Sequence, residues 1–256
     1  MTNQDCLIFC NCTANVISNE KKVHLSDAFH EMDIDVVELN DLCAFSVHGQ
    51  STLRSIGNKY NRKLIVACYP RSVKNMLAQG GVDLGDFDVL NFKTSTVEEI
   101  TRKISDEYFI AAGTSNYEVI KNELDVPAWF PVIDQSLCTL CGKCARFCLF
   151  GVYRFDKENL IVENPLSCKN LCPACGRTCP SQAIIFPRLN EQSALAGDEP
   201  TETASIQIGE NESLLVMLNT RNQNRKSIIK QSVVQLAEEE RQNALDEIKI
   251  MNQKKE

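Results

Sequence analysis

Two stretches decide the fold of this chain: CTLCGKCARFC at residues 138–148 and CKNLCPACGRTCP at residues 168–180. The first has the spacing C-x2-C-x2-C-x3-C. The second has C-x3-C-x2-C-x3-C, with Pro180 directly after its last cysteine. Together they hold eight of the thirteen cysteines of the chain: Cys138, Cys141, Cys144, Cys148, Cys168, Cys172, Cys175 and Cys179.

This spacing predicts two iron–sulfur clusters. A [4Fe–4S] cluster needs four thiolates that converge on one centre. In paired cysteine runs of this kind, three closely spaced cysteines hold one cluster and the fourth crosses to the other. We therefore assign Cys138, Cys141, Cys144 and Cys179 to the first cluster, and Cys168, Cys172, Cys175 and Cys148 to the second.

Zinc sites and disulfide bonds are the alternatives for so many cysteines. Zinc ribbons use separated C-x2-C pairs and need no third cysteine two residues further on. Disulfide frameworks belong to secreted chains, and an odd count of thirteen fits them poorly. The spacing therefore favours iron–sulfur clusters.

At these residues the chain resembles the bacterial two-cluster ferredoxins, over about residues 131–188. The resemblance implies an α+β domain, in which we expect residues 131–137 to pair with 183–188, and 151–156 with 159–164. The sequence departs from the family pattern twice. Leu149 stands where the family usually has proline, and one extra residue lies between Cys168 and Cys172. Neither change removes a ligand.

The first part of the chain predicts an α/β domain with a small, mainly parallel sheet. Short apolar runs typical of buried strands alternate with helix-like stretches. The apolar runs are at 6–14, 34–39, 63–70 and 87–92, and the helix-like stretches at 24–32, 50–59, 71–79 and 95–108. Ser95 or Thr96, followed by Glu98 or Glu99, is a plausible start for the last helix. No glycine-rich nucleotide-binding motif is present.

Four more cysteines fall where these predicted strands end. Because the carboxyl ends of parallel strands share one edge, where ligands usually bind, four thiols there are able to hold a further cluster. The alternative is that they are structural thiols in a core, since free cysteine is often buried. Cys6, at the start of its strand, is expected to pack as a small hydrophobic residue. The four candidate ligands are Cys10, Cys12, Cys43 and Cys68.

The segments LIFCNCTANV, ELNDLCAFSVHGQ and LIVACYPRS are similar to the amino-terminal region of the heterodisulfide reductase A subunit, over about residues 5–110. The resemblance implies a third [4Fe–4S] cluster on the same four cysteines. The flavin-binding domain of that family has no counterpart here. Arg71, which follows Pro70, is expected either near this edge of the sheet or on the surface.

The predicted organisation has five parts. An α/β domain at 1–112 is followed by a linker at 113–130, the two-cluster domain at 131–188, a second linker at 189–212 and a helical tail at 213–256. We expect the only tryptophan, Trp129, to pack the two-cluster domain against its neighbour, and Phe147, Phe150 and Tyr153 to wall the clusters. The tail, with apolar residues on one helical face, is able to dock a partner or a second copy.

These features predict an electron-transfer protein of the reducing cytoplasm. It would pass electrons from a donor protein to an acceptor protein, as an electron-relay subunit or partner of a larger redox complex. The net charge of -7 argues against nucleic acid and suggests basic docking surfaces on its partners. Neither a signal peptide nor a membrane span is predicted. The alternatives are a redox enzyme that reduces a small substrate, such as a disulfide, at an amino-terminal cluster, and a scaffold whose clusters only hold the fold.

Overall fold

The computed structural model describes residues 5–113, 115–200 and 242. Apart from Gln242, these residues belong to one compact unit, Met1–Ser205. Residues 201–212 of the second predicted linker and, Gln242 aside, the predicted helical tail at 213–256 lie outside the described residues. In the part of the chain that the structure describes, no helix is both long and apolar enough to cross a membrane.

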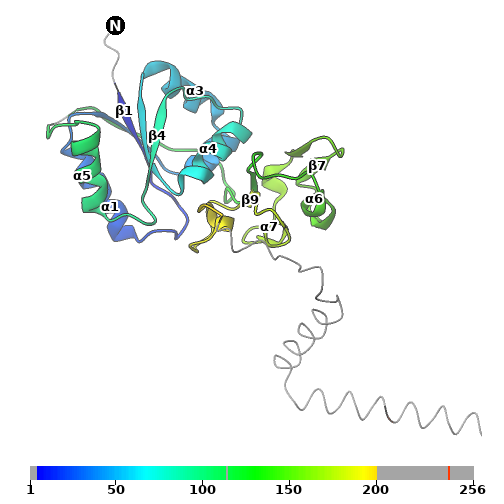
Figure 1. Ribbon diagram of the computed structural model, residues 1–256. Coiled ribbons are helices and arrows are strands. Elements are labelled where there is room, and N and C mark those ends of the chain that lie inside the picture. The colour runs from blue at the N-terminus through cyan, green and yellow to red at the C-terminus, as the bar shows by residue number, and fades with distance from the viewer. Residues whose placement is uncertain (1–4, 114, 201–241, 243–256) are drawn as a thin grey trace, which may run out of the picture. The chain divides into compact units, whose positions relative to one another are not determined.

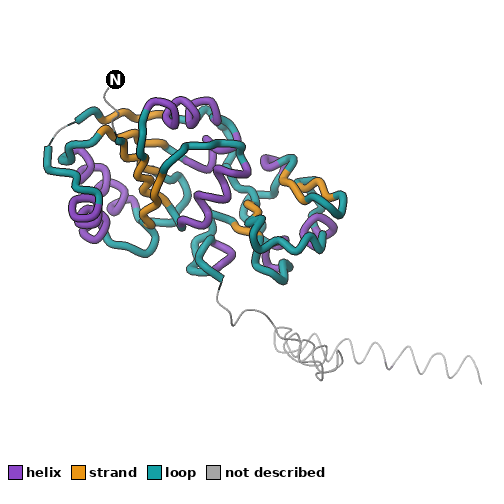
Figure 2. The backbone as a smooth tube through the Cα atoms, turned by 45° about the horizontal axis from the view of Figure 1, so that its top comes forward, coloured by secondary structure: helices purple, strands orange, loops and turns teal. Residues whose placement is uncertain are grey.

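The sheet is parallel and five-stranded, in the order β4-β3-β1-β2-β5 (Figures 1 and 2). Every residue of the central strand β1 is buried, as expected for a parallel strand covered on both faces. Because both faces of the sheet are covered, the side chains of β1 and β3 are apolar along nearly the whole strand and do not alternate with polar ones. The strands are β1 Cys6–Cys10, β2 Asp35–Leu39, β3 Lys63–Ala67, β4 Phe87–Asn91 and β5 Tyr117–Ile120.

Helices cover both faces of this sheet. Figure 1 shows α1 and α5 on one side of the strands and α3 and α4 on the other. The short helix α2 contacts α3 and α4. The helices are α1 Asn19–His30, α2 Leu42–Val47, α3 Gln50–Lys59, α4 Pro70–Gln79 and α5 Val97–Glu107. The sequence-based prediction of a mainly parallel α/β arrangement is confirmed.

The helix starts follow from local chemistry. Thr96 caps α5 by accepting a hydrogen bond from the Glu99 N–H, and the Glu99 carboxylate accepts one from the Thr96 N–H. The side chain of Ser18 caps α1, which begins five residues before the predicted stretch at 24–32. Pro70 begins α4, a position where its missing N–H costs nothing.

Two elements were not predicted from the sequence. The edge strand β5 lies inside residues 113–130, where we expected only a linker, and its residues are exposed or half-buried, so no buried apolar run marks it. Helix α2 has only six residues and starts at Asp41, whose carboxylate accepts a hydrogen bond from the Cys43 N–H. Cys43, which was predicted to follow the second strand, is therefore in the first turn of this helix.

The cysteine-rich segment contains two small antiparallel pairs. Strand β6 (Val132–Ile133) pairs with β9 (Ile184–Ile185), and β7 (Tyr153–Phe155) pairs with β8 (Leu160–Val162). These pairings lie inside the ranges predicted from the sequence. Two short helices, α6 (Lys143–Phe147) and α7 (Ala174–Arg177), carry cysteines of the two runs, and 3-10 turns lie at Pro165–Ser167 and Ala194–Ala196.

Residues 189–200, the described part of the second predicted linker, pack against α4. Buried Arg71, on α4, forms an ion pair with buried Asp134 at 2.6 Å and donates to the Ala194 carbonyl at 3.0 Å. A Cβ on Gly197, whose φ is +109°, would lie 1.7 Å from the Ser72 hydroxyl oxygen. Arg71 is thus buried and not on the surface, the second of the two positions expected from the sequence. It joins α4 to the cysteine-rich segment.

Candidate metal centres

The two cysteine runs share one backbone pattern. Leu140 and Leu171, each directly before the second cysteine of its run, have left-handed φ angles of 53° and 60°. Gly151 and Gln182, each three residues after the last cysteine of its run, have φ angles of 64° and 53°. Non-glycine residues adopt this region rarely, so the repetition is informative. The extra residue of the second run therefore lies between Cys168 and Leu171, and the rest of the two runs corresponds.

The first predicted ligand set converges on buried Cys144. The pKa of the Cys144 thiol is raised to about 12, mainly by burial. A backbone hydrogen bond from Ala145 lowers it, and nearby Cys179, Cys175 and Cys138 contribute to the rise. The structure therefore brings together Cys138, Cys144 and Cys179. Cys141, the remaining member, is exposed.

The second predicted set converges in the same way. Burial raises the pKa of the Cys168 thiol to about 12, together with the nearby Cys175, Cys148 and Cys172. Cys148 and Cys172 also raise the pKa of Cys175. Cys168 and Cys175 thus each have other predicted members of the set as neighbours, and the extra residue before Leu171 leaves Cys168 among them.

Aromatic side chains surround these thiols unevenly. The Tyr153 hydroxyl is 3.1 Å from the Cys175 sulfur, and burial and nearby Cys175 raise the pKa of Tyr153, so it remains protonated and donates. Trp129 is buried and stacks on Phe186 with ring centroids 5.3 Å apart. Phe147 and Phe150, which we expected to wall the clusters, are exposed large hydrophobic residues.

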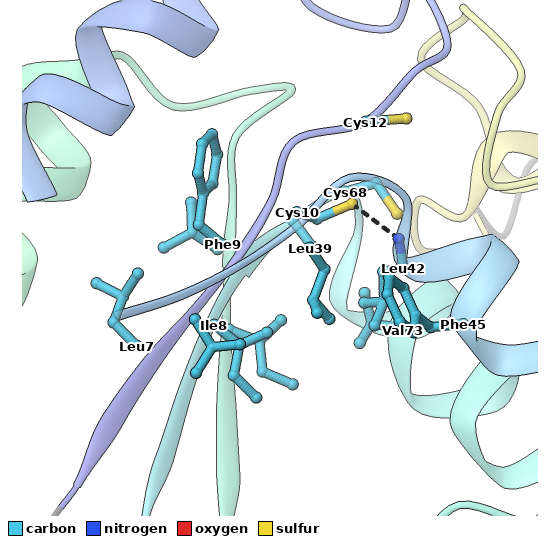
Figure 3. Packing of buried hydrophobic residues seen from close by; sticks show 14 of the residues in the cluster. Leu7, Ile8, Phe9, Cys10, Cys12, Leu39, Leu42, Phe45, Cys68 and Val73 are labelled. Atoms are coloured by element: carbon cyan, nitrogen blue, oxygen red, sulfur yellow. Dashed lines mark hydrogen bonds between the residues drawn. The ribbon is translucent and has the colours of Figure 1, made fainter. Parts of the chain in front are cut away.

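The third predicted set lies at the carboxyl edge of the large sheet, on elements that follow β1, β2 and β3. The four thiols are all buried. Figure 3 shows Cys10 and Cys68 at the ends of neighbouring strands and Cys12 on the loop that follows Cys10. The Leu42 N–H donates to the Cys10 sulfur at 3.4 Å. Burial raises the pKa of Cys43, as do nearby Cys68 and Cys12. We call this set, Cys10, Cys12, Cys43 and Cys68, the rim thiols.

The strand order explains why the rim thiols meet. The chain leaves β1 for β2 on one side and then crosses to β3 on the other, so β1 and β3 flank the point where the strand order reverses. In open parallel sheets this is where ligands bind, outside the carboxyl ends of the strands. Cys10 ends β1 and Cys68 directly follows β3. Cys6, at the opposite end of β1, is fully buried in the core, as predicted.

Comparison with known proteins supports a 4Fe-4S domain in the cysteine-rich segment. A protein-family model described as a 4Fe-4S binding domain matches residues 130–153. An uncharacterized ferredoxin of Methanocaldococcus jannaschii is 32% identical over 116 residues, which are 45% of this chain and 79% of that protein. This chain belongs to the ferredoxin family. No solved structure matches it.

Two cations of this ferredoxin reach the rim thiols from distant parts of the chain. Arg188 forms an ion pair with Asp41 and donates to the Thr13 hydroxyl at 3.0 Å. Lys93 donates to the Leu189 carbonyl at 2.9 Å; burial lowers the pKa of Lys93, and the nearby Cys68 and Cys12 partly oppose this by raising it. Neither cation was predicted from the sequence, because nothing in the local pattern marks a lysine or arginine that folds onto a remote cysteine.

The donor sets of this ferredoxin suit iron–sulfur clusters. All thirteen cysteines are free thiols, and the three histidines are exposed. Sulfur ligands held among backbone N–H groups are what such clusters use. Next to Cys68, the buried Tyr69 hydroxyl has no hydrogen-bond partner among the described residues, so a donor is free near the rim thiols. Within the same residues, no three His, Cys, Asp or Glu side chains are grouped to hold one metal ion.

Proposed function

We propose that this ferredoxin is an electron-transfer protein that holds three [4Fe–4S] clusters. When bound, such clusters take up and release single electrons. The first cluster would be held by Cys138, Cys141, Cys144 and Cys179, the second by Cys168, Cys172, Cys175 and Cys148, and the third by the rim thiols Cys10, Cys12, Cys43 and Cys68.

The observation that carries this proposal is the convergence of the thiols in sets. Cys144 has Cys138 and Cys179 as neighbours, and Cys168 has Cys175, Cys148 and Cys172. The raised pKa values of Cys144 and Cys168 keep these thiols protonated when no metal is bound, and a positive centre among them would favour the thiolate forms that ligate iron. Four irons in each set would supply that charge.

The surrounding residues have supporting roles in this proposal. Tyr153 donates to Cys175, and a hydrogen bond to a ligand sulfur favours the more negative, reduced state of a cluster. Arg188 and Lys93 place positive charge near the rim thiols, with the same effect there. The burial of the rim thiols keeps water away from them.

We further propose that the protein is an electron-relay subunit or partner in a larger redox complex. Its two-cluster domain at 131–188 would be joined to an α/β domain that resembles the heterodisulfide reductase A subunit. The alternative, an enzyme that reduces a small substrate at the rim, requires that the substrate reach an iron. The rim thiols are 5% to 8% exposed, which favours relay of electrons over access by a substrate.

Anaerobic purification followed by iron and sulfide counting tests this proposal. We expect about twelve iron atoms and about twelve sulfides in each chain, since each cube holds four of each. The variant Cys68→Ala should lower the count by about four, while Cys6→Ala, an equally conservative change of a buried cysteine away from the rim, should leave it unchanged. A count of about eight iron atoms in the unaltered protein would show that the third cluster is absent. A colourless protein, or one with zinc in place of iron, would refute the proposal.

A further inference from the structure

The charge of this ferredoxin is distributed unevenly along the chain. The net charge of the whole chain is -7, yet residues 135–155 and 164–190 contain no aspartate and no glutamate. These are the segments that carry the eight cysteines of the two runs. They contain six cations: Lys143, Arg146, Arg154, Lys169, Arg177 and Arg188.

Three of these cations have no acidic partner among residues 5–113 and 115–200, and the other three do. Arg154, Arg177 and Arg188 pair with Glu163, Glu191 and Asp41. In contrast, the exposed Arg146 donates to the Cys141 carbonyl at 2.6 Å and keeps its charge uncompensated. Over residues 5–113 and 115–200, exposed Lys143 and Lys169 form no ion pair.

Large hydrophobic side chains are exposed on the same segments. Leu149 is 90% exposed and directly follows Cys148, and Leu171 is 73% exposed and directly precedes Cys172. Since Cys148 and Cys172 both lie near Cys168, these leucines flank one set of thiols. We define the docking face as Phe147, Leu149, Phe150, Leu166 and Leu171 together with Lys143, Arg146 and Lys169.

We propose that the docking face binds an acidic surface on a redox partner protein. Exposed apolar residues that alternate in the chain with uncompensated cations fit a partner surface that offers both apolar contact and carboxylates. The face adjoins Cys148 and Cys172, so a partner bound there would meet the second ligand set of the proposed function, on which this inference rests. The net charge had suggested a basic partner surface, but the local charge has the opposite sign.

The chain's own carboxyl-terminal segment is a weaker candidate for this face. Residues 201–256 contain nine acidic and eight basic side chains, so their net charge is close to zero. A nearly neutral segment gives little electrostatic complementarity to the three unpaired cations.

Binding to two small haem proteins of opposite charge tests the proposal. The full chain, purified without oxygen, is titrated with acidic cytochrome b5 and basic cytochrome c at low ionic strength, by calorimetry. We expect cytochrome b5 to bind, with an affinity that falls steeply as salt is added, and cytochrome c not to bind at this face. The double variant K143E/K169E should weaken the binding of cytochrome b5 about ten-fold or more, since each exposed charge contact contributes up to about a five-fold effect.

The matched control is K74E/K121E, which makes the same change in net charge at two exposed lysines outside the face. An equal loss in this control, binding of cytochrome c at the same site, or no binding of cytochrome b5 would overturn the proposal. So would displacement by a synthetic peptide of residues 206–256, or preferential binding to phosphatidylglycerol vesicles. Calorimetry records binding alone, so a separate assay mixes cytochrome b5 with protein that has been reduced by dithionite and then freed of the excess. Cytochrome b5 that binds but is not reduced in that assay would contradict the proposed function and leave the docking face intact.

Discussion

Replacing Arg71 by methionine should destabilise the protein more than any substitution of an exposed residue, because Arg71 joins α4 to the cysteine-rich segment. The Arg71 guanidinium donates to the Asp134 carboxylate at 2.6 Å, and to the carbonyls of Gln182, Ala194 and Asp198 at 2.7, 3.0 and 3.1 Å. Methionine has a similar length and packs in the same space, but it donates no hydrogen bond. The variant therefore leaves a buried carboxylate and three carbonyls without their cation.

The magnitude follows from burial. Both side chains of the ion pair are at most 7% exposed, and removing one partner of such a pair costs about 3–5 kcal/mol. In a domain of this size, 1 kcal/mol lowers the midpoint of thermal unfolding by about 2–4 °C. We therefore expect the midpoint of thermal unfolding of Arg71→Met to lie about 6–20 °C below that of the unaltered protein. Arg154→Met is the control, because the Arg154–Glu163 pair is exposed and contributes at most about 1 kcal/mol.

The assay is anaerobic differential scanning calorimetry at one scan rate, with the free energy compared between pH 7.5 and pH 5. Burial raises the pKa of Asp134, but hydrogen bonds from Ser136 and Arg71 outweigh it, so the net pKa is lowered. A lowered pKa stabilises the fold above the unfolded value of about 3.9, and this stabilisation is lost below it. Without Arg71, no cation opposes the effect of burial on Asp134, so the pKa of Asp134 rises. As the pH falls, Asp134 becomes protonated and the loss of stability in the variant becomes smaller.

The destabilisation of Arg71→Met should accordingly be largest at pH 7.5 and smaller at pH 5. The double variant Arg71→Met/Asp134→Asn should recover part of the loss, since no buried charge remains uncompensated. Two results would refute this account of the buried pair: unfolding of Arg71→Met within about 2 °C of Arg154→Met, or a deficit that grows as the pH is lowered.

Three other substitutions have definite outcomes. Tyr153→Phe removes the donor to Cys175 and should lower the reduction potential of one cluster by about 20–60 mV, at unchanged iron content, in an EPR-monitored redox titration; an unchanged potential would contradict the role of the hydroxyl. Thr96→Ala removes the capping box of α5 and should cost about 1 kcal/mol in calorimetry, whereas Ser95→Ala should cost little. Arg188→Gln leaves buried Asp41 without its cation and should speed iron loss from the rim to a chelator relative to Arg146→Gln, and equal rates would argue against it.

The parallel sheet could be predicted because its central strands are short and buried on both faces. The runs CLIFC and KLIVA have no polar alternation, which is typical of strands covered by helices on both sides. Once those strands are taken as parallel, the positions of Cys10 and Cys68 at one edge follow from topology alone. Strand β5 was missed for the opposite reason, since its burial pattern as an edge strand carries no such run.

The contacts that hold the cysteine-rich segment in place could not be predicted from the sequence. Arg71 and Asp134 are 63 residues apart, and Arg188 and Asp41 are 147 apart. Helical and strand periodicities relate residues within one element, so they say nothing about pairs at these separations. Each arginine looks like an ordinary surface residue until the fold is known.

The role of Asp41 shows why the rim should not be regarded as a property of the α/β region alone. One carboxylate oxygen accepts the Cys43 N–H and starts α2, while the other accepts hydrogen bonds from Thr13 and Arg188. Arg188 follows β9 closely in chain order, after Phe186 and Pro187, and thus belongs to the cysteine-rich segment. The position of Cys43 therefore depends on a residue from that segment. If the rim thiols and the two cysteine runs act together in electron transfer, the Asp41 carboxylate couples them, because a displacement of Arg188 would change the position of Cys43.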